Sequence, residues 1–169
     1  MPQSIDDLIK ALEGVGYYAD RRLATAVFLA LKLERPLLLE GEPGVGKTEL
    51  AKALSQVLSR PMIRLQCFDG MEQREALYEW NYTAQLLHMR ALEGQPSSAP
   101  ADVERAVYGP RFLIARPLLQ ALQAPAPGAV LLIDEVDRAD EPFEAFLLEY
   151  LGAGFAPSGR LSAPCRFLL

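Results

Sequence analysis

The residues with the clearest chemistry form a glycine-rich turn after a short apolar run. Leu37-Leu38-Leu39 precedes Gly41-x-x-x-x-Gly46-Lys47-Thr48, a spacing typical of loops that bind phosphate. Glycine permits backbone dihedrals closed to other residues, so the amide groups of such a loop can converge on one anion. Lys47 is expected to neutralise β- and γ-phosphate oxygens, and the Thr48 hydroxyl to ligate Mg²⁺. The expected nucleotide-binding residues are Gly41, Glu42, Pro43, Gly44, Val45, Gly46, Lys47, Thr48 and Glu49.

A pair of acids ends a second apolar segment. Ala129-Val130-Leu131-Leu132-Ile133 leads into Asp134 and Glu135, and continuous apolar character is typical of a strand covered on both faces. Charges at the end of a buried strand need a partner, which a metal ion supplies. We expect Asp134 to hold Mg²⁺ through water and Glu135 to activate an attacking water. Lys47 and Glu135 are the expected catalytic residues.

Strands and helices must hold these two groups in place. Apolar residues recur at helical spacing after the glycine-rich turn, so strand, turn and helix are expected in that order. Pro61 to Gln66 predicts a further strand, and residues 68–123 have a helical but irregular composition. Ser4 and Asp20 predict capped helices upstream. Tyr17, Tyr18 and Ala19 lie in the joint between those helices, where the tyrosines either pack the junction or, as the resemblance to AAA+ ATPases described below implies, contact an adenine.

Composition narrows the class of protein. The chain has 169 residues, half of them hydrophobic, and a net charge of −5, which suits one globular domain. Its basic residues form no run, which argues against nucleic acid as a main partner. No apolar stretch is long enough for a membrane span, and the N-terminus lacks a signal-peptide pattern. We therefore expect a cytoplasmic protein, in which Cys67 and Cys165, which form no C-x-x-C pair, are reduced.

Several segments resemble the MoxR family of AAA+ ATPases. They are Gly41 to Ala51, Leu131 to Ala139 and Glu144 to Leu151. Further segments resemble the CoxD-type accessory proteins of carbon monoxide dehydrogenase and related molybdenum hydroxylases within that family. These are Tyr18 to Ala26, Arg64 to Cys67 and Tyr78 to Tyr82. The likeness covers roughly residues 5–151.

The resemblance implies a fold, ligands and partners. The implied fold is α/β, a P-loop NTPase three-layer αβα sandwich with a parallel sheet. ATP and Mg²⁺ are the implied ligands, and the implied assembly is a homo-oligomeric ring, often a hexamer. A protein with a von Willebrand A domain is the implied partner. The implied task is ATP-driven, chaperone-like remodelling during metal-cofactor maturation of a client metalloenzyme.

The resemblance also predicts how the chain is divided. We expect a single AAA+ nucleotide-binding core over residues 1–169, with N-terminal helices over 1–35, the two nucleotide motifs over 36–151 and a truncated or atypical tail over 152–169. Complete relatives continue with a sensor strand, an arginine finger, a fifth strand and a helical lid, which we expect to be absent. In the family strand order, 5-1-4-3-2, the fourth strand lies between the strands of the two motifs. Residues 166–169 either supply a short version of it or form a tail without that role.

Three functions stay open from the sequence. The first is ATP binding and hydrolysis, completed by a sensor and an arginine finger from elsewhere. The second is a truncated module that binds nucleotide without hydrolysis and docks partners through residues 68–123. The third is a P-loop kinase of small metabolites. The pair Asp134-Glu135 argues against the kinase, because two acids at the end of an apolar strand suit activation of water better than binding of an acceptor hydroxyl.

Overall fold

The computed structural model describes residues 1–42, 44–92, 106–152 and 166–168 of the chain. Two helices come first, α1 (Ile5–Gly14) and α2 (Arg21–Leu33). Ser4 Oγ accepts a hydrogen bond from an amide in the first turn of α1 at 3.1 Å, and Asp20 Oδ1 does the same for α2 at 2.7 Å. Such bonds satisfy amide groups that have no partner inside the helix. The predicted caps are confirmed.

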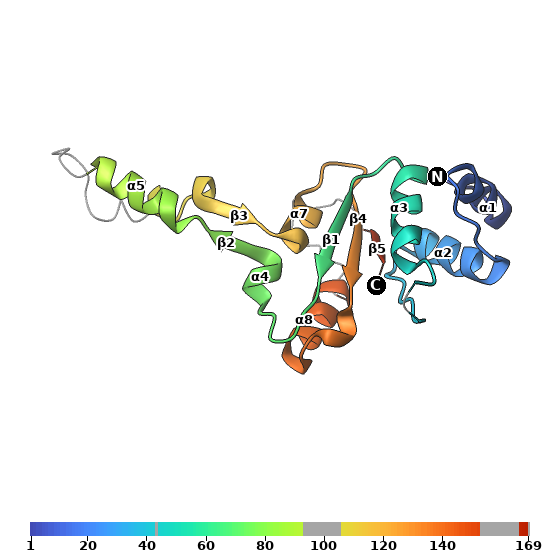
Figure 1. Ribbon diagram of the computed structural model, residues 1–169. Helices are drawn as coiled ribbons and strands as arrows, with labels where there is room; N and C mark the ends of the chain where they lie inside the picture. Colours follow the sequence, from blue (N-terminus) through green and yellow to red (C-terminus); the bar gives the residue numbers. More distant parts are fainter. Residues whose placement is uncertain (43, 93–105, 153–165, 169) are drawn as a thin grey trace.

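A parallel sheet forms the centre of the molecule (Figure 1). Strand β4 (Val130–Asp134) lies between β1 (Met62–Gln66) and β5 (Arg166–Leu168), and both neighbours pair with it in parallel. Val130, Leu131, Leu132 and Ile133 are all buried, as a strand covered on both faces requires. The predicted strand before the acid pair is therefore confirmed.

Helices cover both faces of this sheet and make three layers (Figure 1). Helix α3 (Lys47–Val57) packs on one face together with α1 and α2, while α7 (Pro117–Gln123) and α8 (Glu141–Gly152) pack on the other. Side chains alternate between the two faces along a strand. Val130 and Leu132 accordingly join the cluster under α3, whereas Leu131 and Ile133 join the cluster under α7 and α8. The αβα sandwich with a parallel sheet is confirmed.

The chain segment that connects β1 to β4 forms an arm that extends away from the sheet (Figure 1). Helix α4 (Gln73–Leu77) leads into β2 (Tyr78–Trp80), which pairs antiparallel with β3 (Leu113–Ala115). The described part of the arm also contains helix α5 (Tyr82–Leu92) and a short 3₁₀ turn, η1 (Pro110–Phe112). The helical composition of residues 68–123 did not predict this hairpin. Its strands are three residues long and lie more than thirty positions apart, so local periodicity could not reveal their pairing.

The segment expected to form a strand before the glycine-rich turn has β-type pairing at Leu37 alone. Leu37 makes a single β-bridge, and Leu38 is 55% exposed. Leu37 and Leu39 nevertheless pack against the cluster under α3. The expectation of a continuous buried strand is wrong for Leu38.

Strand β5 bears on the prediction for the end of the chain. Residues 166–168 pair with β4 on the side away from β1, which is where a short fourth strand should lie. Pairing of these residues with the Leu37 segment stays a prediction, and Leu169 lies outside the described residues. Within the described part of the chain, the helices lack the length and apolar character needed to cross a membrane.

Candidate functional site

The glycine-rich turn leads directly into helix α3. Gly44 has φ +85° and Gly46 has φ +95°, a backbone region that residues with a side chain rarely adopt. Gly46 is the N-cap of α3, so Lys47 is the first helical residue. Amide groups in the first turn of a helix lack intrahelical partners and carry partial positive charge. The turn therefore has the backbone geometry of an anion site.

Lys47 lies folded against the turn that precedes it. Its Nζ donates hydrogen bonds to the carbonyl oxygens of Gly41 and Glu42, the second at 3.1 Å. An ammonium group has three donors, so these bonds hold its charge over the loop and leave donor capacity for a ligand. Thr48 follows half-buried in the first turn of α3. The ammonium and the hydroxyl thus both belong to the start of one helix.

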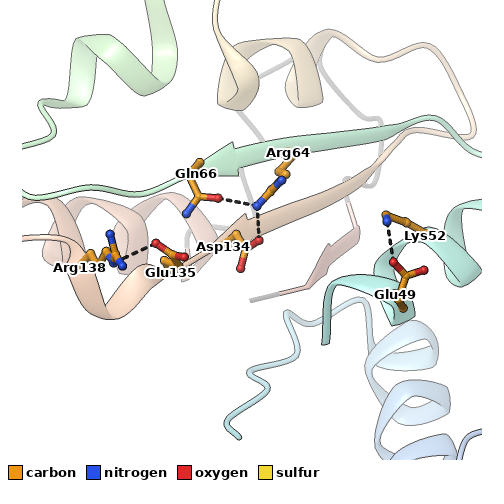
Figure 2. A network of polar contacts seen from close by, with 7 residues as sticks. All are labelled: Glu49, Lys52, Arg64, Gln66, Asp134, Glu135 and Arg138. Carbon is orange, nitrogen blue, oxygen red and sulfur yellow. Dashed lines mark hydrogen bonds and ion pairs between the residues drawn. The ribbon is translucent and has the colours of Figure 1, made fainter. Parts of the chain in front are cut away.

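The other predicted loop residues are placed as follows. Gly41, Glu42, Gly44 and Val45 are exposed, and Pro43 lies outside the described residues. Glu49 forms an ion pair with Lys52 one turn further along α3, at 2.6 Å (Figure 2). Its carboxylate is engaged within the helix, and a role for it toward a ligand stays a prediction.

The ring of Tyr17 lies beside the turn. A Cβ placed on Gly46 would be 3.8 Å from Tyr17 Cε2, and Tyr17 packs against the cluster under α3. Burial, and to a smaller extent the charge of Asp20, raise the pKa of the Tyr17 hydroxyl. Tyr18 is exposed. The two tyrosines of the helix joint are therefore not equivalent, and Tyr17 is the one that reaches the loop.

Asp134 lies on the same side of the sheet as α3. Val130 and Leu132 point toward the cluster under α3, and Asp134 is the next residue of that alternation. Its side chain is only 20% exposed. The acid at the end of β4 and the helix that starts at Lys47 therefore share one face, as a common metal–phosphate site requires.

Arg64 binds Asp134 across the pair of strands. Its Nη2 donates to Asp134 Oδ2 at 2.8 Å and to Gln66 Oε1 at 2.6 Å (Figure 2). The parallel register aligns Gln66 with Asp134, and Arg64, two positions earlier, lies on the same face. Sequence reasoning missed this partner. The signal available was the spacing of Arg64 and Gln66, which places two polar side chains on one face of a strand.

Glu135 has an unusual backbone conformation. Its φ of 56° and ψ of 44° are left-handed, which is strained for a residue with a side chain and recurs at functional sites. Its Oε2 pairs with Nε of Arg138 at 2.9 Å (Figure 2). Glu135 is 44% exposed. Its carboxylate thus stands at the carboxyl end of β4, next to Asp134, and is held by an arginine three residues later.

The buried thiol of Cys67 lies close enough to the acids at this end of the sheet for their charges to affect its pKa. Burial, followed by the negative charges of Asp134, Asp137 and Glu135, raises its pKa to about 11. Two of these acids already have cationic partners, Arg64 at Asp134 and Arg138 at Glu135.

The donor atoms here suit Mg²⁺ rather than a fully protein-bound metal. Mg²⁺ prefers oxygen donors and is usually held by one or two carboxylates together with phosphates and waters. Asp134 and Thr48 offer a carboxylate and a hydroxyl. Among the described residues, His, Cys, Asp and Glu form no group of three or more that could hold a metal ion.

Comparison with known proteins gives the family. Residues 36–152, which include the glycine-rich turn and the acid pair, match the AAA domain of the dynein-related subfamily. A stretch of 54 residues is 40% identical to Midasin of Giardia intestinalis. That stretch is 32% of this chain and 1% of Midasin, so the chain spans a very small part of this relative. The AAA domain match over residues 36–152 covers more than half of this chain, so the chain belongs to the AAA domain family, dynein-related subfamily.

Proposed function

We propose that this AAA domain binds ATP with Mg²⁺ at the N-terminus of α3 and hydrolyses it within an assembly. The observation that carries the proposal is that Asp134 and the start of α3 lie on one face of one sheet. The amide groups of residues 44–48 would hold the phosphates, and Lys47 would neutralise their β- and γ-oxygens. Thr48 and Asp134 would hold Mg²⁺, which supplies further charge neutralisation on the phosphate oxygens.

Glu135 is the proposed base. Its carboxylate accepts a proton from a water molecule as that water attacks the γ-phosphorus, and the bond to the leaving β-phosphate oxygen breaks. Arg138 holds the carboxylate at 2.9 Å, so it must release or reorient it when the water binds. Phosphoryl transfer depends on such positioning, and an arginine finger adds about 10³–10⁵-fold in rate. We assign that finger to a neighbouring subunit.

We further propose the MoxR-like, CoxD-type task for the whole protein. In it, residues 1–169 form one nucleotide-binding core, copies of the chain assemble into a ring, and a von Willebrand A-domain protein links the ring to a metalloenzyme client in the cytoplasm. The support is the resemblance of the segments around Lys47, Asp134 and Trp80 to that family. Light scattering with and without Mg²⁺–ATP tests the ring, and co-purification with the candidate partner tests the task.

Nucleotide titration tests the site itself. Calorimetry with Mg²⁺–ATP should give no detectable binding for Lys47→Ala. Lys52→Ala is the matched control, because it removes the same charge from the same helix at the exposed ion pair with Glu49. Glu135→Gln should bind nucleotide and lose hydrolysis. Equal affinities for Lys47→Ala and the unmodified protein would refute the proposal.

A nucleotide-binding module without hydrolysis is the second candidate. One observation favours it: both acids are already paired within the chain, Asp134 with Arg64 and Glu135 with Arg138. In that case nucleotide would act as a structural ligand. Single-turnover hydrolysis with protein in excess over ATP separates the two candidates, since only the first predicts release of phosphate.

A further inference from the structure

The ion pair between Arg64 and Asp134 occupies the carboxylate that the proposed function assigns to Mg²⁺. A single nitrogen, Nη2, makes both bonds, to Asp134 at 2.8 Å and to Gln66 at 2.6 Å (Figure 2). An Nη group carries two hydrogens, so the two acceptors use both of them. The guanidinium is thereby held across β1 and β4, with its charge against Asp134.

The surroundings of the pair are unequal. The side chain of Asp134 is 20% exposed, whereas that of Arg64 is 50% exposed. The acid is therefore fixed at the end of β4, and the arginine is the partner with room to move. Gln66 offers Arg64 an acceptor that remains when Asp134 is taken by another cation.

Two cations compete for the same carboxylate. A hydrated Mg²⁺ ion would approach Asp134 through water protons, and it would meet the guanidinium already bonded to Oδ2 of the same carboxylate. A guanidinium left in place would also repel the ion, and that repulsion is strong where the carboxylate is largely shielded from water. Simultaneous occupation is therefore unfavourable.

We propose that Arg64 is a built-in competitor of Mg²⁺ at Asp134. Without nucleotide, the guanidinium neutralises the acid. When Mg²⁺ arrives with the triphosphate, Arg64 leaves Asp134 and keeps its bond to Gln66. Arg64 thus sets the Mg²⁺ concentration at which metal and nucleotide bind together. This inference depends on the proposed nucleotide site but concerns only its Mg²⁺ dependence.

The test measures binding of a fluorescent ATP analogue over a range of Mg²⁺ concentrations. Arg64→Gln, which removes the charge, should lower the Mg²⁺ concentration for half-maximal tightening by roughly 10-fold, as expected for loss of a charge-assisted hydrogen bond. Affinity in EDTA should not rise, because Asp134 then loses the charge that neutralises it beside the triphosphate. Arg64→Lys should behave like the unmodified protein. The matched control is Arg21→Gln, which removes the same charge from the exposed pair with Asp6 and should leave the Mg²⁺ dependence unchanged.

Two further measurements keep the result interpretable. In an Asp134→Ala background, Arg64→Gln should not change the Mg²⁺ concentration for half-maximal tightening, because the competition needs the carboxylate. In the unmodified protein, the Nη proton signals of Arg64, assigned by their loss in Arg64→Lys, should shift on addition of Mg²⁺–ADP but not of ADP in EDTA. This second readout is measured on the unmodified protein, and the Arg64→Lys variant serves only to assign the signals.

The outcomes are distinct. An unchanged Mg²⁺ requirement for Arg64→Gln would overturn the inference. A higher requirement would also overturn it, because Arg64 would then hold Asp134 in position for the ion. Failure of the unmodified protein to bind any nucleotide would contradict the proposed function instead.

Discussion

Glycine at position 135 should give a more stable fold than alanine at the same position. Glu135 has φ 56° and ψ 44°, and this left-handed conformation costs a residue with a side chain roughly 1–2 kcal/mol. Glycine avoids that cost, but its greater freedom in the unfolded chain offsets about 0.4–1 kcal/mol. Both substitutions remove the carboxylate and its ion pair with Arg138, so that contribution cancels. The free energy of unfolding of Glu135→Gly should therefore exceed that of Glu135→Ala by about 0.8 kcal/mol, the difference between the centres of the two ranges.

The assay is urea or thermal unfolding without nucleotide. A difference of that size corresponds to roughly 1–4 °C in Tm for a chain of this length. Ala145→Gly is the matched control, because Ala145 is exposed within α8. There glycine should be the less stable residue by about 1 kcal/mol. If Glu135→Ala were as stable as Glu135→Gly while the control behaved normally, the left-handed conformation at the end of β4 would be refuted.

Three further predictions concern the fold. Leu131→Ala should lower the free energy of unfolding by about 2–5 kcal/mol, because it leaves a cavity at a fully buried site. Leu148→Ala, at an exposed position of α8, should change the free energy of unfolding by less than about 0.5 kcal/mol. Similar losses for the two variants would contradict the assignment of the core. Asp20→Ala should cost about 1 kcal/mol in urea unfolding through loss of the 2.7 Å cap of α2, and no loss would contradict that cap. The pKa of Cys67 is raised to about 11 from an ordinary 9.0. In a Cys165→Ser variant at pH 8, Cys67 should therefore react with iodoacetamide at least about 100-fold more slowly in the folded chain than in the urea-unfolded chain. Equal rates would contradict its burial.

The sequence predicted those parts of the molecule that depend on local signals. Gly44 and Gly46 have the positive φ angles expected of a glycine-rich turn, and the apolar run before Asp134 is a strand buried on both faces. Ser4 and Asp20 cap the helices they precede. Each of these features is set by residues within a few positions of one another, so a pattern in the chain is sufficient to find it.

The missed features depend on register between distant strands. Arg64 and Asp134 are 70 positions apart and meet because β1 and β4 pair with Gln66 opposite Asp134. The β2–β3 hairpin likewise joins Tyr78 to Ala115 within a region of helical composition. Leu38 is exposed although its run is as apolar as that of β4, because strand burial is decided by neighbours rather than by the run itself. Helix and strand periodicity contain no information on such pairings.

The most direct measurement of the central claim is a crystal structure with Mg²⁺ and a non-hydrolysable ATP analogue at saturating concentration. The account predicts triphosphate density against the amide groups of residues 44–48, with the metal between Thr48 and Asp134 and with Arg64 turned away from that acid. A folded protein whose glycine-rich turn carries no nucleotide under those conditions, or whose nucleotide binds on the α7–α8 face of the sheet, would contradict it.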